Sequence, residues 1–197
     1  MHVDEAIATR RTHKVYDGTP VPRATVEALI QAALWAPNHR FTEPWRFVAA
    51  TGDTLVPLGE AACAALDSMR KAPGVADAKI DTKQRKFRQR MKECGAVVIV
   101  TYVATPDNPA MDREDYAATA CGVQNMQLAA TARGLVCLWS TSAVFSHPIV
   151  RAHLGIPPGQ ELVACLFIGK PVTELRGRRH KPLGEVTRWL EDAHVRV

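Results

Sequence analysis

The sequence contains no apolar run that approaches the roughly 20 residues a helix needs to cross a bilayer. Its first residues, "MHVDEAIATRR", also lack the apolar centre of a secretory signal. We therefore expect a cytoplasmic protein without a membrane partner.

Several patterns typical of metal sites and nucleotide-binding loops are missing. The cysteines, carboxylates and histidines show no metal-ligand spacing, so we expect no metal site. No Gly-x-Gly-x-x-Gly motif follows a strand, no Walker loop is present, and no serine or cysteine has a recognisable base partner. These absences argue against a Rossmann site, a P-loop and a catalytic triad. Any chemistry is then expected to come from a bound cofactor.

The cysteines lie in apolar surroundings without paired spacing, and we expect all of them to be buried, reduced thiols. They are Cys63, Cys94, Cys121, Cys137 and Cys165.

The composition is that of an ordinary globular protein with an excess of positive charge. Hydrophobic residues make up 47% and charged residues 23%, which excludes a disordered or fibrous chain. The 197 residues contain no repeat or linker, so we expect one domain over residues 1–197. The net charge of +5 favours an anionic partner, whether a phosphate-bearing cofactor, a nucleotide or nucleic acid.

Beta-branched apolar runs predict buried strands at "RFVAAT", "AVVIVTYV", "LVCLWSTSA" and "ELVACLFIGK". Helical periodicity is clearest over residues 22–36. A second helix is expected over residues 112–134, where small and apolar residues cover most of the circumference and predict burial on several sides. Together these elements predict a layered α/β or α+β domain.

The segment "DAKIDTKQRKFRQRMKEC" is basic and amphipathic, with Ile80 and Phe87 as its only strong apolar anchors before Met91. It is interpreted either as a partly exposed lid or as a solvated helix face. A nucleic-acid interface is the weakest interpretation, because the segment has one aromatic residue and no recognition motif.

Basic residues gather just after the first short helix, at Arg10, Arg11 and Lys14, with Thr12 between them. Two guanidinium groups and a hydroxyl suit a phosphate monoester. A solvated basic helix end is an equal alternative from these residues alone, because such side chains also satisfy helix carbonyls.

Four short motifs follow one another along the chain: "RRTHK", "PNHRFTEPWRF", "LWSTS" and "IGKP" with "RGRRHKPLGEV". Their order and spacing resemble the flavin-dependent nitroreductase family, in its small single-domain branch. The resemblance extends from Val3 to Trp189. It implies an α+β fold, a three-layer α/β/α sandwich with a mixed, mainly antiparallel central sheet, and an obligate homodimer.

The resemblance also implies a binding site for FMN. Arg10, Arg11 and Thr12 would hold the phosphate and ribityl chain, with Lys14 near the flavin pyrimidine. The late basic stretch matches a further phosphate-binding position, assigned to Arg179 with these alternatives: Arg178, His180 and Lys181.

Two further groups of residues match positions beside the flavin ring. The group expected to lie along the isoalloxazine comprises Trp139, Ser140 and Thr141. The group expected to reach the flavin from the other subunit comprises Trp35, Asn38 and His39. Trp45 is interpreted as core.

Two positions depart from the usual family pattern. Thr12 replaces serine and keeps a hydroxyl, whereas Glu43 replaces glutamine and changes the hydrogen bonding near the loop. Independently of the family, FMN needs clustered donors for its phosphate and an apolar slot for its ring, and the chain offers both.

The implied function is an FMN-dependent oxidoreductase that uses NAD(P)H to reduce nitroaromatic, quinone-like or related small-molecule acceptors by a ping-pong mechanism. The chemistry is expected at flavin N5, with no catalytic side chain. The alternatives are a related flavin-consuming or dehalogenating enzyme and a non-catalytic flavin-binding protein.

Overall fold

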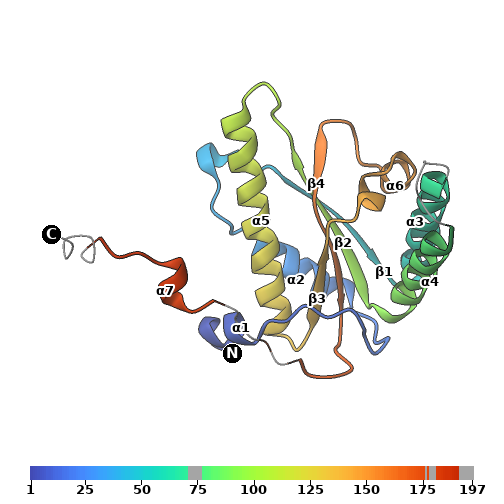
Figure 1. Ribbon diagram of the computed structural model, residues 1–197, viewed down its shortest axis with the longest axis horizontal. Coiled ribbons are helices and arrows are strands. Elements are labelled where there is room, and N and C mark those ends of the chain that lie inside the picture. Colours follow the sequence, from blue (N-terminus) through green and yellow to red (C-terminus); the bar gives the residue numbers. More distant parts are fainter. Residues whose placement is uncertain (71–76, 176, 178–180, 191–197) are drawn as a thin grey trace.

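The computed structural model describes residues 1–70, 77–175, 177 and 181–190 (Figure 1). Its centre is a four-stranded sheet in the order β1-β2-β4-β3. The strands are β1 (Trp45–Thr51), β2 (Ala96–Val103), β3 (Val136–Ser140) and β4 (Gln160–Gly169). Neighbouring strands are antiparallel, and a parallel bridge joins Thr12 to Cys137 of β3. All four strands match apolar runs of the sequence.

Helices cover both faces of the sheet (Figure 1). One face carries α2 (Arg23–Ala33) and α5 (Pro109–Thr131), and the other carries α3 (Leu55–Arg70), α4 (Asp77–Glu93) and α6 (Pro148–Leu154). Strand alternation divides the core between them: Val97 and Ile99 face α3 and α4, whereas Val98 and Val100 face α2 and α5. The expected three-layer α/β/α sandwich is therefore confirmed.

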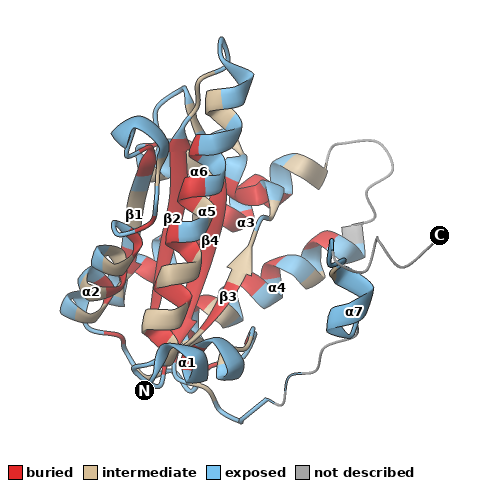
Figure 2. Ribbon diagram, turned by 90° about the vertical axis from the view of Figure 1, so that its left-hand side faces the viewer, coloured by how far each residue is buried: buried red, intermediate tan, exposed pale blue. Residues whose placement is uncertain are grey.

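The central strands are continuous apolar runs because both of their faces are covered. Figure 2 shows β2 and β4 buried along most of their length, while α1 (Val3–Thr9) and α7 (Leu183–Val186) are largely exposed. Short 3₁₀ turns, η1 (His39–Phe41), η2 (Gly52–Thr54) and η3 (Ala143–Ser146), complete the elements of the described residues.

The two helices expected from periodicity are present with shifted ends. The first, α2, ends at Ala33, three residues earlier than predicted. The second, α5, begins at Pro109, because Asn108 caps it by accepting a hydrogen bond from the Met111 N–H and proline suits the first helical turn.

The prediction that every cysteine is buried is wrong for Cys121, which is exposed. Its neighbour Gly122 faces α2, where an added β-carbon would lie 3.2 Å from the Ala33 carbonyl oxygen. Because the Gly122 side of α5 packs closely against α2, the adjacent Cys121 side chain lies on an outer side of the helix. The other cysteines are buried, and burial raises the pKa of Cys94 and of Cys137 to about 12. Buried thiols of this kind are poor nucleophiles.

The basic segment is the regular helix α4, and it packs against α3. Ile80, Phe87 and Met91 are buried, and the Gln84 side-chain amide donates to the Cys63 carbonyl at 3.0 Å. Its outer face is polar and exposed. Among the described residues, no helix has both the length and the apolar character needed to span a membrane.

Candidate functional site

The expected phosphate-binding segment runs beside the edge strand β3. After α1 ends, the His13 N–H donates to the Cys137 carbonyl at 3.2 Å. The buried Tyr16 hydroxyl donates to the carbonyl oxygens of His13 and Phe167, at 3.1 and 3.2 Å. Burial raises the pKa of Tyr16, so the phenol keeps its proton and fixes the path of this segment.

Side chains of this segment point to different surfaces. Arg11 and His13 line a pocket of about 500 Å³, whereas Thr12 between them and Lys14 after them are exposed. This is the alternation of extended backbone. Burial lowers the pKa of His13, so its imidazole is neutral at pH 7.

The pocket lies between α1, the C-terminal end of α5 and the chain that follows β4. It is lined by Thr9, Arg11, His13, Thr131, Val136, Pro171, Thr173, Glu174, Leu175 and Gly177. Arg11 Nη1 donates to the Arg10 carbonyl at 2.6 Å, and its buried Nε has no hydrogen-bond partner among the residues that the structure describes. Because an unpaired buried donor is costly, this guanidinium is suited to receive an acceptor atom.

The segment expected along the flavin ring lies at the end of β3. Trp139 is half-buried, and its indole N–H donates to the Val163 carbonyl at 3.0 Å. Ser140 is half-buried, and Thr141 is exposed. The β3 edge therefore brings the segment of residues 10–14 beside the strand that leads to residues 139–141.

The loop between α2 and β1 carries the remaining predicted residues. Trp35 is exposed, and the Asn38 side-chain carbonyl accepts from the Glu43 N–H at 3.1 Å. His39 Nδ1 lies 2.6 Å from Glu114 Oε2, within hydrogen-bond distance, and this contact places the loop beside the first turns of α5.

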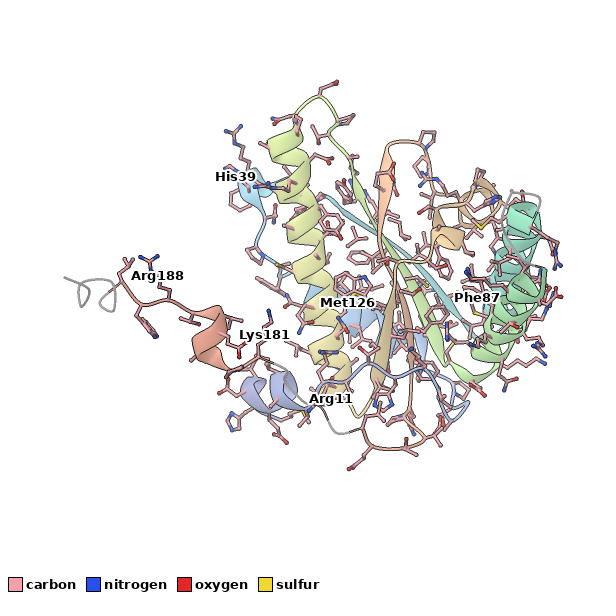
Figure 3. The ribbon with its side chains drawn as sticks, in the orientation of Figure 1. Arg11, His39, Phe87, Met126, Lys181 and Arg188 are labelled. Carbon is pink, nitrogen blue, oxygen red and sulfur yellow. The ribbon has the colours of Figure 1, made fainter. Side chains whose placement is uncertain are left out.

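The two groups of predicted residues are far apart in one chain. His39 lies beside the N-terminal end of α5 and Arg11 beside its C-terminal end (Figure 3). Glu114 and Thr131, which neighbour them on α5, are separated by almost five helical turns, or about 25 Å. Arg178, Arg179 and His180 fall outside the described residues, and Lys181 is exposed before α7.

Sequence reasoning missed four side chains that shape these surfaces: His13, Thr42, Glu114 and Asp115. His13 could have been paired with Arg11 from the alternation of "RRTHK". The Thr42 hydroxyl donates to Asp115 Oδ1 at 2.6 Å across 73 positions of sequence, and no local pattern indicates such a contact.

An α/β/α sandwich with a basic segment beside its β3 edge defines a layered α+β protein. The model of the nitroreductase family matches residues 7–170, and the chain belongs to this family. The expected family membership is confirmed.

Known proteins of this family resemble the chain over most of its length. The Bacillus subtilis protein YfhC, whose name assigns it provisionally as an NAD(P)H nitroreductase, is 26% identical over 182 residues, which is 91% of this chain and 89% of YfhC. A nitroreductase-like family protein from Bacillus cereus superimposes with a TM-score of 0.84 at 26% identity, covering 97% of both chains. A Bacteroides fragilis nitroreductase with bound FMN shares the fold, with a TM-score of 0.74 at 24% identity, covering 96% of this chain and 99% of the other.

Proposed function

We propose that this protein is an FMN-dependent oxidoreductase that uses NAD(P)H to reduce nitroaromatic, quinone-like or related small-molecule acceptors. The observation that carries the proposal is the buried Nε of Arg11, which has no partner within the described part of the chain and belongs to a basic segment that borders the β3 edge. Family membership and the names of the relatives, which include NAD(P)H and bound FMN, support the same assignment.

The residues present fit FMN. Arg10, Arg11 and Thr12 supply charge-assisted and hydroxyl donors for a dianionic phosphate, and Lys14 is an exposed cation beyond them. The end of β3, at Trp139, Ser140 and Thr141, supplies a half-buried ring and polar backbone for the flat part of the cofactor. When bound, FMN supplies hydride and electron transfer between nicotinamide and acceptor.

The protein's own role is to bind and orient the two substrates in turn. We propose a ping-pong order, in which NAD(P)⁺ leaves before the acceptor enters the same pocket. In this proposal Lys14 would stabilise negative charge on the pyrimidine side of the ring. Solvent delivers the proton to the product.

We further propose that the functional unit is a homodimer in which Trp35, Asn38 and His39 of one chain complete the site of the other. About 25 Å of α5 separates this loop from the Arg11 pocket, and this separation supports a site shared between two chains. The exposed α5 residues Tyr116 and Cys121 are available to a symmetric interface.

Absorption spectroscopy of the purified protein, followed by release of the chromophore on denaturation, tests the proposal. We expect a yellow protein that releases FMN and oxidises NADH or NADPH when 4-nitrobenzoate is supplied. A colourless protein that FMN does not reconstitute would overturn it, and a yellow protein without NAD(P)H oxidation would leave a flavin-binding module.

A further inference from the structure

The loop between α2 and β1 contains unusual backbone geometry. Arg40, Phe41 and Glu43 all have positive φ angles, of 54°, 54° and 43°. Side chains larger than glycine rarely adopt this left-handed region, and a bulky residue there is an outlier. Such strain persists only where the surroundings impose it, and it gathers at functional sites.

Contacts on both sides of the turn hold this geometry. The Thr42 hydroxyl donates to Asp115 Oδ1, at 2.6 Å, and Asp115 is only 3% exposed on α5. Arg46 Nη1 donates to the Glu43 carbonyl at 2.9 Å. The turn is therefore fixed against α5 and against the start of β1.

The strained turn holds an aromatic ring in solvent. Phe41 is 90% exposed, whereas Trp45, four residues later, is only 6% exposed in the core. Burial of a phenylalanine ring in the core would favour folding of the single chain. Because the Phe41 ring is not in the core, core packing does not explain the strained backbone of this turn. The ring is therefore available to a bound molecule or to a second chain.

We infer that Phe41 is a specificity-determining residue, which stacks on the ring of an aromatic electron acceptor in the flavin site of the second chain. The inference rests on the proposed function, because it places this loop at the partner's site. A flat apolar ring next to an exposed cation suits an aromatic acceptor whose substituents carry negative charge, such as a nitro or carboxylate group. The cation is Arg40, which belongs to the same strained turn.

The test compares three variants of the holoenzyme: Phe41→Ala, Phe41→Leu and Phe41→Tyr. Leucine keeps apolar bulk without a ring, and tyrosine keeps the ring. Binding of benzoate, which flavin does not reduce, is followed through the flavin absorbance. Turnover is measured with 4-nitrobenzoate and with ferricyanide, which has no aromatic ring.

Loss of one aromatic contact predicts about a 3- to 10-fold weaker benzoate affinity in the alanine and leucine variants. We expect a similar fall in kcat/KM for 4-nitrobenzoate, near wild-type values in the tyrosine variant, and unchanged kcat/KM for ferricyanide.

Unchanged benzoate affinity in Phe41→Ala, or an equal fall with both acceptors, would overturn the inference while the proposed function stands. Dissociation of the Phe41→Ala dimer in sedimentation would also overturn it, since the ring would then be an interface residue. A wild-type protein that binds no FMN would instead defeat the proposed function, and the inference with it.

Discussion

At the scale of single residues, the segment after α1 separates neighbouring side chains that look equivalent in sequence. Arg11 turns into the pocket with His13, while Thr12 and Lys14 stay at the surface. A phosphate bound in the pocket would meet the partly desolvated Arg11 guanidinium, whereas Thr12 and Lys14 are outside the pocket lining. This is a stronger setting for an anion than a solvated helix end, because charge-assisted hydrogen bonds gain strength where water is excluded.

The residue-scale prediction concerns Arg10, which leads this segment. We expect Arg10→Ala to weaken FMN binding by about 1.5–3 kcal/mol, because a charge-assisted hydrogen bond is lost. Flavin fluorescence titration measures the change. Arg23→Ala is the matched control, since Arg23 is exposed and pairs with Glu27 at 2.7 Å, one helical turn away. An unchanged FMN affinity in folded Arg10→Ala protein would move the phosphate toward the stretch that ends at Lys181.

At the scale of elements, α5 sets the position of the loop that follows α2. The loop makes two contacts with successive residues of this helix, His39 with Glu114 and Thr42 with Asp115. The first contact is exposed, and the second ends on a buried carboxylate. We expect the His39–Glu114 contact to contribute less to stability than the Thr42–Asp115 contact. Exposed ion pairs contribute about 0–1 kcal/mol, whereas a buried acceptor is costly to leave unpaired.

Removal of the hydroxyl in Thr42→Val should lower the free energy of unfolding by about 1–3 kcal/mol, because Asp115 then loses its donor. The control is Glu114→Gln, for which we expect a change below about 1 kcal/mol. Urea denaturation of both variants measures the difference. Equal effects would show that the buried contact does not dominate the anchoring of the loop.

At the scale of the whole molecule, the chain leaves surfaces that a single copy does not cover. The segment that contains α7 projects away from the sheet, and its apolar residues Leu183, Val186, Trp189 and Leu190 are exposed (Figure 1). An isolated single turn of helix is not stable by itself in water. Together with the separation of His39 from Arg11, this arrangement favours a functional unit of two chains.

A mixed dimer tests the shared site. An Arg10→Ala chain and a His39→Ala chain are first assayed as homodimers at an FMN concentration at which each is inactive. They are then co-expressed with different tags, and the dimer that carries both tags is purified. If the residues meet across the interface, one site collects both defects and the other has neither. About half of the wild-type activity should then return, as two-fold symmetry requires.

Low activity in that mixed dimer would place both residues in the site of their own chain. A monomeric protein that binds flavin fully would contradict the shared site in the same way. A mixed dimer of wild-type and Arg10→Ala chains provides the reference for one intact site.

The sequence by itself determined the strands, two of the long helices and the family. These depend on local periodicity and on the order of short motifs: the apolar runs match β1 to β4, and the helix predicted over residues 112–134 is α5, which begins three residues earlier, at Pro109. Helix ends were less accurate: α2 ends at Ala33, three residues before the predicted end. The cytoplasmic location, the single domain and the flavin contacts stay predictions.

Only the tertiary structure decided which side chains share a surface. It paired His39 with Glu114 across 75 positions, turned Cys121 outward and placed the ring of Phe41 in solvent. Sequence motifs do not carry such information, because these outcomes depend on how α2 and α5 approach each other and on the path of the chain between them. Periodicity fixes the faces of each helix or strand, and the packing of one element against another fixes what each face meets.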